Sequence, residues 1–320
     1  MASWEVATGT LFLAQVICGI LGNFSLLSHH VFLSLTGFKA RCTDLILRHL
    51  LVANCLVILS YGVPQAVTAL RWKFLPSDAE CNLLFYVQRV SRAVFIESTC
   101  FLSIFQAITI SPRNSRWAEL KVKAPRYIGL SSMLCWILNM LINTIIPIYV
   151  TSKWINTSIT KRKDYGYCNA VFQDTFTGSL FLALLLLPDA VSLGLMLLAS
   201  SYMVFILHRH KQQVQHIHGP RNASPRTSPE SRATRSILAL VSTFVFFYTV
   251  SSTFQVYLAL LSKPSRLTVN ISALFAGCFP TLSPYLLMSC DSRVSRLCFA
   301  WIRNTKSPNI IRNMYLVFAL

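Results

Sequence analysis

Residues 98–123 read STCFLSIFQAITISPRNSRWAELKVK, an apolar segment that runs directly into a basic one. Its first half continues an apolar run that begins near residue 82, and its second half, from Arg113 onward, is a basic loop. An apolar run of roughly 20 residues or more crosses the hydrocarbon core of a bilayer as a helix, which satisfies its own backbone polar groups. The stretch therefore predicts a membrane-spanning helix whose last turn, at Phe105, Gln106 and Ala107, carries no charge before the basic loop begins.

The composition of the whole chain supports the same fold class. Of 320 residues, 54% are hydrophobic and 12% are charged, and the mean hydropathy of +0.53 is too high for a water-soluble domain of this size. The apolar runs are long and continuous rather than short and alternating, which favours helices over a β-barrel. We therefore predict one all-α, seven-transmembrane domain followed by a tail at 290–320, with spans near residues 8–31, 45–69, 82–110, 128–150, 179–207, 236–262 and 269–289.

The distribution of lysine and arginine predicts the topology. No basic segment precedes the first run, which follows MASWEVAT, so we interpret that run as a retained span rather than a signal peptide. With the amino terminus outside, the cytoplasmic segments carry eighteen lysines and arginines and the outer segments carry eight. Basic residues concentrate on the cytoplasmic side of membrane proteins. We therefore expect a multi-pass plasma-membrane protein with an extracellular amino terminus.

Several other functional classes find no support in the sequence. The net charge of +18 suits anionic lipid head groups and cytosolic partners, and no compact soluble basic domain indicates a nucleic-acid partner. The ten cysteines form no CxxC pair, and four histidines between residues 208 and 218 lack an acidic or cysteine partner. The spans contain no HExxH or GxSxG motif. We predict no metal site, no cofactor and no enzymatic activity.

Two cysteines and one sequon stand out on the outer side. Cys81 opens the third span and Cys168 lies in the longest outer loop, so they are either a disulfide that ties the loop to the bundle or two free thiols. We predict the disulfide, because the other cysteines fall inside spans or on the reducing cytosolic side. Asn156 begins an N-x-S sequon in the same loop and is the predicted glycosylation site.

The upper part of the third span carries the strongest candidates for ligand binding. Gln88, Arg89 and Arg92 lie two to three turns below the predicted outer surface, with positions 88 and 92 on one face. A charge at that depth faces a bundle interior, a water cavity or a partner charge. A guanidinium offers bidentate contacts to a sulfate or carboxylate, so we predict an acidic small amphiphile. The alternative is a structural pair between Arg92 and an acid such as Asp189 of the fifth span.

The rest of a pocket would come from the outer halves of neighbouring spans. An amide or aromatic side chain in a membrane bundle more often packs against or bonds to another helix than to a ligand. With that alternative open, the further ligand-binding candidates are Gln65, Asn143, Phe181, Gln255 and Tyr257.

Landmark residues in a fixed order resemble those of G-protein-coupled receptors. They are the Gly-Asn pair at Gly22 and Asn23 in the first helix, Trp136 in the fourth, Pro188 in the fifth and Pro284 in the seventh. The upper third span has no aspartate and the seventh span has no lysine, so neither an aminergic salt bridge nor an opsin Schiff base has a residue to form it.

Departures from the common receptor pattern narrow the resemblance. In the second span, Asn54 stands where most rhodopsin-like receptors have an aspartate, and in the third, FQA at 105–107 replaces their acid-arginine-tyrosine motif. In the seventh span, SPYLL at 283–287 replaces NPxxY, and the sixth span lacks tryptophan and proline. Over essentially the whole chain the sequence is similar to vomeronasal type 1 receptors. The most specific segments are TGFKARCTDLILRHLLVAN (36–54), TCFLSIFQAITISPRNSRWAELK (99–121), LHRHKQQVQHIH (207–218) and FPTLSPYLLM (279–288).

This resemblance implies a receptor for a small pheromone or other semiochemical that signals through a Gi/Go-type heterotrimeric G protein. The predicted G-protein contacts are Phe105, Gln106, Arg113 and Arg116, at the inner end of the third span and in its basic loop. The expected mechanism is a population shift in which the ligand favours an active helix arrangement.

The alternative function is a transporter or channel. Its ion path would use the intramembrane charges Arg89, Arg92, Glu97 and Asp189. Against it, the seven runs show no internal repeat or symmetric halves.

Overall fold

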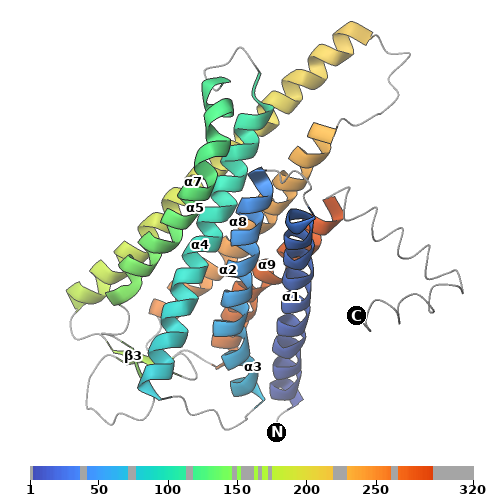
Figure 1. The fold of residues 1–320 in the computed structure, drawn as a ribbon. Coiled ribbons are helices and arrows are strands. Elements are labelled where there is room, and N and C mark those ends of the chain that lie inside the picture. Colours follow the sequence, from blue (N-terminus) through green and yellow to red (C-terminus); the bar gives the residue numbers. More distant parts are fainter. Residues whose placement is uncertain are drawn as a thin grey trace, which may run out of the picture.

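The structure is a computed structural model that describes residues 3–36, 42–70, 77–112, 118–145, 150–152, 162–164, 168–171, 175–218, 229–260 and 266–290. Within these residues the chain forms seven helical rods, which confirms the predicted helical bundle, and one small sheet (Figure 1). The rods are α1 (Ser3–Leu35), α2 (Cys42–Val57) with its continuation η1 (Ile58–Gly62) and α3 (Val63–Ala69), α4 (Asp78–Ile110), α5 (Ala118–Ile142) ending in the 3₁₀ turn η2 (Asn143–Ile145), α7 (Thr175–His218), α8 (Pro229–Leu260) and α9 (Arg266–Cys290).

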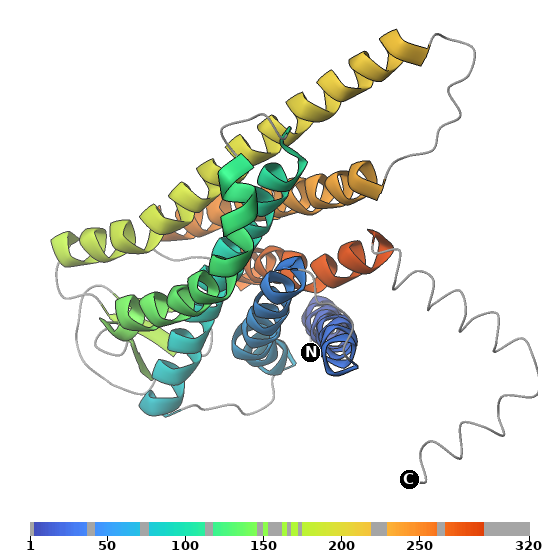
Figure 2. The same ribbon diagram turned by 45° about the horizontal axis from the view of Figure 1, so that its top comes forward.

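α4 occupies the centre of the bundle. It packs against α2, α5, α7 and α8, while α1 packs against α2 and α9, and α8 packs against α9 (Figures 1 and 2). One core cluster joins five rods through buried side chains such as Leu50 of α2, Val94 of α4, Met203 of α7, Phe244 of α8 and Phe279 of α9. The far end of α7 projects beyond the rest of the bundle in both views. The third span of the sequence analysis is thus the axis on which the other helices assemble.

The second rod changes helix type partway along its length. η1 is a π-helix that runs directly into α3, where Pro64 occupies the first turn. Proline has no N–H, so the carbonyl four residues earlier loses its α-helical donor, and the preceding turn widens. Gly62 ends the π-helix, and a Cβ at this position would lie 2.9 Å from Cγ2 of Val16 in α1. Glycine here therefore allows α1 to approach the widened turn closely.

α4 begins at a well-defined cap. The Ser77 hydroxyl accepts a hydrogen bond from the Glu80 backbone N–H at 3.3 Å, and a Glu80 carboxylate oxygen accepts one from the Ser77 N–H at 2.7 Å. This capping box satisfies free donors at the helix start and fixes the first turn. Cys81, in that turn, is fully buried and disulfide-bonded.

A small antiparallel sheet lies beside the start of α4, a feature that the sequence analysis did not predict. Its strands are β1 (Val150–Ser152), β2 (Arg162–Asp164) and β3 (Cys168–Val171), in the order β1-β3-β2. Ser152 pairs with Cys168, and β1 packs against α4. We call this end of the bundle the sheet end (Figure 1).

A buried polar cluster ties α1, α2 and α9 together. Asn54 Nδ2 donates hydrogen bonds to Asn23 Oδ1 at 3.0 Å and to Ser283 Oγ at 2.8 Å, and Asn23 Nδ2 donates to the Pro280 carbonyl at 2.9 Å. The side chains of Asn23, Asn54 and Ser283 are fully buried. Asn54 and Ser283, both uncharged, therefore join α2 to α9 through a hydrogen bond.

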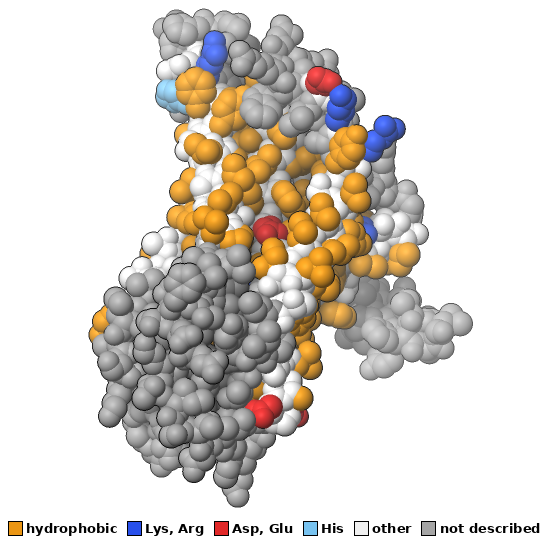
Figure 3. All heavy atoms as spheres, turned by 90° about the vertical axis from the view of Figure 1, so that its left-hand side faces the viewer, with side chains coloured by type: hydrophobic (Ala, Val, Ile, Leu, Met, Phe, Trp, Pro, Cys, Tyr) orange, Lys and Arg blue, Asp and Glu red, His pale blue; other side chains and the backbone are white. Residues whose placement is uncertain are grey.

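The outside of the bundle is apolar, as expected of a protein in lipid. Large hydrophobic side chains such as Leu21 and Phe24 of α1, Leu130 of α5 and Leu198 of α7 are exposed. Figure 3 shows hydrophobic side chains over much of the described part of one face, with a few charged side chains among them. Among the described residues, five helices are long and apolar enough to cross a membrane, and α5 and α8 contain shorter apolar segments. Each of these two helices begins with a charged stretch before its apolar segment, AELKVKAP in α5 and PESRATR in α8.

Candidate functional site

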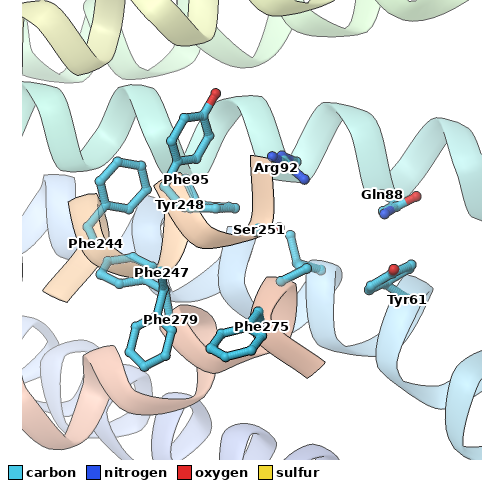
Figure 4. A pocket seen from close by; sticks show the side chains of 12 residues that line it. Tyr61, Gln88, Arg92, Phe95, Phe244, Phe247, Tyr248, Ser251, Phe275 and Phe279 are labelled. Atoms are coloured by element: carbon cyan, nitrogen blue, oxygen red, sulfur yellow. The ribbon is translucent and has the colours of Figure 1, made fainter. Parts of the chain in front are cut away.

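A cavity opens between η1, α4, α8 and α9. The empty space inside it, including the part that is open to solvent, is about 430 Å³. The residues that line it are Val57, Tyr61, Gln88, Arg92, Phe95, Phe244, Phe247, Tyr248, Ser251, Phe275, Ala276 and Phe279 (Figure 4). We call it the aromatic cavity, because seven of these side chains are phenylalanine or tyrosine.

Helical spacing brings the lining residues to one space. On α4, positions 88, 92 and 95 are four and three residues apart, and on α8 positions 244, 247, 248 and 251 follow the same periodicity. Residues at such spacing share one helix face. In Figure 4 Gln88 and Tyr61 lie at one end of the cavity, the phenylalanines of α8 and α9 lie at the other, and Arg92 lies between them.

The aromatic end of the cavity is rigidly packed. The ring of Phe244 makes an edge-to-face contact with Phe279 at a centroid distance of 4.9 Å and stacks on Tyr248 at 5.4 Å. Phe95 stacks on Phe279 at 5.8 Å. Such ring pairs contribute about 0.5–1.5 kcal/mol each beyond the area they bury. The cavity is therefore preformed at its aromatic end and offers flat apolar walls.

Arg92 is the charged group of the cavity wall. Its guanidinium carbon lies 5.6 Å from the centroid of the Tyr248 ring, within cation–π distance. Its Nε atom is buried, and no described residue accepts a hydrogen bond from it. A buried donor without a partner is costly, so this guanidinium is suited to an acceptor that enters the cavity.

Asp189 of α7 lies behind this wall rather than in it. The side chain is 6% exposed and accepts a hydrogen bond from the Tyr248 hydroxyl at 3.4 Å. It interacts electrostatically with both Arg92 and Arg89. Among the described residues, however, no salt bridge within contact distance joins Arg92 to Asp189. The structural pair considered in the sequence analysis is therefore a longer-range interaction mediated by Tyr248.

The predicted ligand-binding residues fall into three groups in the structure. Gln88 and Arg92 line the aromatic cavity. Arg89, Gln65, Asn143 and Tyr257 are not among its lining residues: Gln65 and Asn143 are buried elsewhere, and Tyr257 is 52% exposed. The side chains of Phe181 and Gln255 lie outside what the structure describes.

Most of the aromatic wall was missed by the sequence analysis, although a signal for it exists. Phe244, Phe247, Tyr248 and Ser251 follow an i, i+3, i+4, i+7 pattern, and Phe275 and Phe279 are four residues apart. The pattern shows that each helix has an aromatic face. The structure adds that these faces point toward Arg92 rather than toward lipid.

Glu97 forms a second intramembrane polar group on α4, away from the aromatic cavity. One of its carboxylate oxygens accepts hydrogen bonds from the Cys135 thiol and from Asn139 Nδ2, the latter at 2.9 Å. Both donors belong to α5. These bonds offset the cost of placing a carboxylate within the membrane and join α4 to α5.

The predicted G-protein contacts on α4 are largely covered by neighbouring side chains in this conformation. Gln106 is 7% exposed, and Phe105 packs against the core cluster. Arg113 and Arg116 lie outside the described residues, as does Asn156. Ser111, at the end of α4, is hydrogen-bonded through its hydroxyl to that of Tyr202 in α7, at 3.1 Å.

Comparison with known proteins assigns this bundle to a family. The sequence matches the vomeronasal organ pheromone receptor family over residues 6–300. The chain belongs to this family. It is 54% identical to vomeronasal type-1 receptor 4 of Homo sapiens over 95% of this chain and the whole of that receptor. It is 50% identical to vomeronasal type-1 receptor 3 of Homo sapiens over 98% of this chain and the whole of that receptor.

A more distant relative shows how far the similarity extends. Olfactory receptor class A-like protein 1 of Danio rerio is 27% identical over 89% of this chain and 90% of its own length. Members of the vomeronasal type 1 family are seven-transmembrane G-protein-coupled receptors, so this chain is a multi-pass membrane receptor of the pheromone class and not an enzyme. The resemblance drawn from the sequence is confirmed.

Proposed function

We propose that this vomeronasal type 1 receptor binds an acidic, semiochemical-like amphiphile in the aromatic cavity and then activates a Gi/Go-type heterotrimeric G protein. The observation that carries the proposal is the Arg92 guanidinium, which lies in the cavity wall with a buried donor unpartnered among the described residues. The ligand's acidic group binds Arg92 and Gln88, and its apolar body packs against the aromatic end.

The surroundings of Arg92 favour an anion over a second structural role. Tyr248 covers one side of the guanidinium, and Asp189 is held by the Tyr248 hydroxyl rather than by Arg92 directly. Gln88, a polar residue one turn away on the same helix, also lines the cavity. An incoming carboxylate or sulfate gains charge-assisted hydrogen bonds from the Arg92 guanidinium.

Signal transfer in this proposal runs from the cavity to the opposite end of the bundle. The amino terminus and the sheet end are extracellular, Cys81 pairs with Cys168 to hold the sheet against α4, and Asn156 carries a glycan. Ligand binding changes the packing of α4 against α7 and α8, which opens the inner end and exposes Phe105, Gln106 and the basic loop with Arg113 and Arg116 to the G protein.

The proposal is tested by Arg92→Gln, which removes the charge and keeps a polar side chain. We expect an acidic ligand found by screening sulfated and carboxylated amphiphiles to lose about ten- to a hundredfold in potency, since a charged hydrogen bond contributes about 1.5–3 kcal/mol. Neutral ligands should change little. The measurement is nucleotide exchange on purified Gi/Go heterotrimer, with surface display checked for each variant.

Arg89→Gln is the matched control, because Arg89 is on the same helix but not among the lining residues of the cavity. Arg92→Lys keeps the charge without the bidentate geometry and should give an intermediate potency. An equal loss for acidic and neutral ligands in Arg92→Gln would show that Arg92 only holds the bundle together. No exchange on any heterotrimer with a bound ligand would overturn the signalling half of the proposal.

A further inference from the structure

A second cavity lies behind the aromatic cavity, between α1, η1 and α9. The empty space inside it, including the part that is open to solvent, is about 280 Å³. Its lining includes Phe12, Gln15 and Val16 of α1, Ala273 and Gly277 of α9, and the hydroxyl-bearing Thr281. None of its lining residues carries a charge. This rear cavity is therefore suited to a neutral, largely apolar group.

The two cavities share a wall. Val57 and Tyr61 line both of them, and on α9 the neighbouring residues Ala276 and Gly277 line the aromatic and the rear cavity respectively. Tyr61 is half-buried and packs against the cluster of Phe12, Ala66 and Ala273 on the rear side. The Tyr61 ring therefore forms part of the boundary between the two spaces.

The helix type explains why Tyr61 occupies this position. It lies in the π-helical turn η1, where an extra residue per turn displaces the side chains from the register of a regular α-helix. π-helical turns are frequent at functional sites. Here the turn places one aromatic ring in the lining of both cavities, and Figure 4 shows Tyr61 near Gln88 at one end of the aromatic cavity.

We propose that the rear cavity binds the apolar end of elongated ligands and that the Tyr61 side chain controls how long a ligand the receptor accepts. This inference rests on the proposed function, because the acidic end of the ligand is held at Arg92. A short ligand fills the aromatic cavity alone. A long ligand enters the rear cavity only when the Tyr61 ring turns aside. The ring therefore limits the affinity of long ligands.

The test uses 4-alkylbenzoates, in which the carboxylate and ring stay constant and the straight alkyl chain is lengthened one carbon at a time. Binding is measured as the ligand-induced thermal shift of the purified receptor in nanodiscs. We expect Tyr61→Ala to strengthen binding of long members by up to about fourfold for each methylene that enters the rear cavity. Short members should bind as they do to the wild type.

A second substitution shows whether the gain comes from the rear cavity. Val16→Phe fills that cavity from α1 and, combined with Tyr61→Ala, should abolish the gain for long members while short members still bind. Tyr61→Phe keeps the ring and should behave as the wild type. If Val16→Phe prevents folding, Ala273→Val narrows the same cavity from α9.

The outcomes separate this inference from the proposed function. Binding of short members with no length-dependent change in Tyr61→Ala, or a gain that survives Val16→Phe and Ala273→Val, would overturn the role of the rear cavity alone. If no 4-alkylbenzoate binds to a receptor that does bind other acids, the proposed role of the rear cavity is also overturned. Binding that does not depend on Arg92 would instead overturn the proposed function.

Discussion

Arg92 has two neighbours of different chemistry, the aromatic ring of Tyr248 and the acidic side chain of Asp189. The Tyr248 ring covers its guanidinium, and the Tyr248 hydroxyl donates to Asp189, so the tyrosine separates the cation from the nearby acid. Asp189 still interacts electrostatically with Arg92. An anion in the aromatic cavity would therefore be attracted by Arg92 and repelled by Asp189, because effective dielectric constants within proteins are lower than in water.

This balance predicts the effect of Asp189→Asn. The amide keeps an oxygen that accepts the Tyr248 hydrogen bond but removes the negative charge. We expect acidic ligands to bind more tightly, by up to about tenfold, which corresponds to roughly 1.4 kcal/mol. Neutral ligands should be unaffected. The measurement is ligand affinity by thermal shift, and a loss of both ligand classes with a lower melting temperature would instead assign Asp189 a structural role.

Among the helices, α4 and α7 are joined through hydroxyl groups at the end of the bundle opposite the sheet. The Ser111 hydroxyl donates to the Ala107 carbonyl at 2.9 Å and also bonds to the Tyr202 hydroxyl. The Lys121 ammonium of α5 donates to the Ser111 carbonyl at 3.5 Å, at the negative end of the α4 dipole. Three helices thus meet at Ser111, beyond the uncharged turn at residues 105–107.

We expect Tyr202→Phe to raise ligand-independent signalling. The substitution removes the hydroxyl that bonds Ser111 and keeps the ring, and one net hydrogen bond contributes about 0.5–1.5 kcal/mol. The active fraction should increase about two- to tenfold, measured as basal nucleotide exchange on the G protein. Tyr127→Phe, at an exposed position of α5, is the matched control. Unchanged basal exchange in Tyr202→Phe would show that this contact does not hold the inactive state.

Sequence patterns predict some parts of this fold and site better than others. The seven helices follow from the apolar runs, and Gln88 and Arg92 share a face because they are four residues apart on one helix. Tyr61 and the α8 and α9 aromatics could not be placed, since rotation of each helix about its axis depends on packing against all its neighbours. The π-helical turn before Pro64 adds a further rotation that helical periodicity does not predict.

The whole molecule has apolar side faces and two unequal ends, and this asymmetry predicts an orientation in the membrane. The exposed leucines and phenylalanines of α1, α5 and α7 form the lipid-facing surface, whereas the helical ends opposite the sheet carry basic residues such as Lys121, Lys123 and Arg209. Anionic lipids of the cytoplasmic leaflet attract such residues. The sheet end, where Cys81 is disulfide-bonded, suits the oxidising outer side.

This asymmetry predicts that the sheet end is extracellular. An epitope tag before Met1 should be labelled on intact cells, and a tag after Leu320 only after permeabilisation. Asn156→Gln should abolish the glycosidase-sensitive shift in mobility, because that sequon lies between β1 and β2 on the sheet side. Asn222→Gln alters a matched sequon between α7 and α8, at the opposite end, and should leave the shift intact. Loss of the glycan in Asn222→Gln together with labelling of the carboxyl-terminal tag on intact cells would require the inverted topology, and Arg92 would then face a ligand arriving from the cytosol.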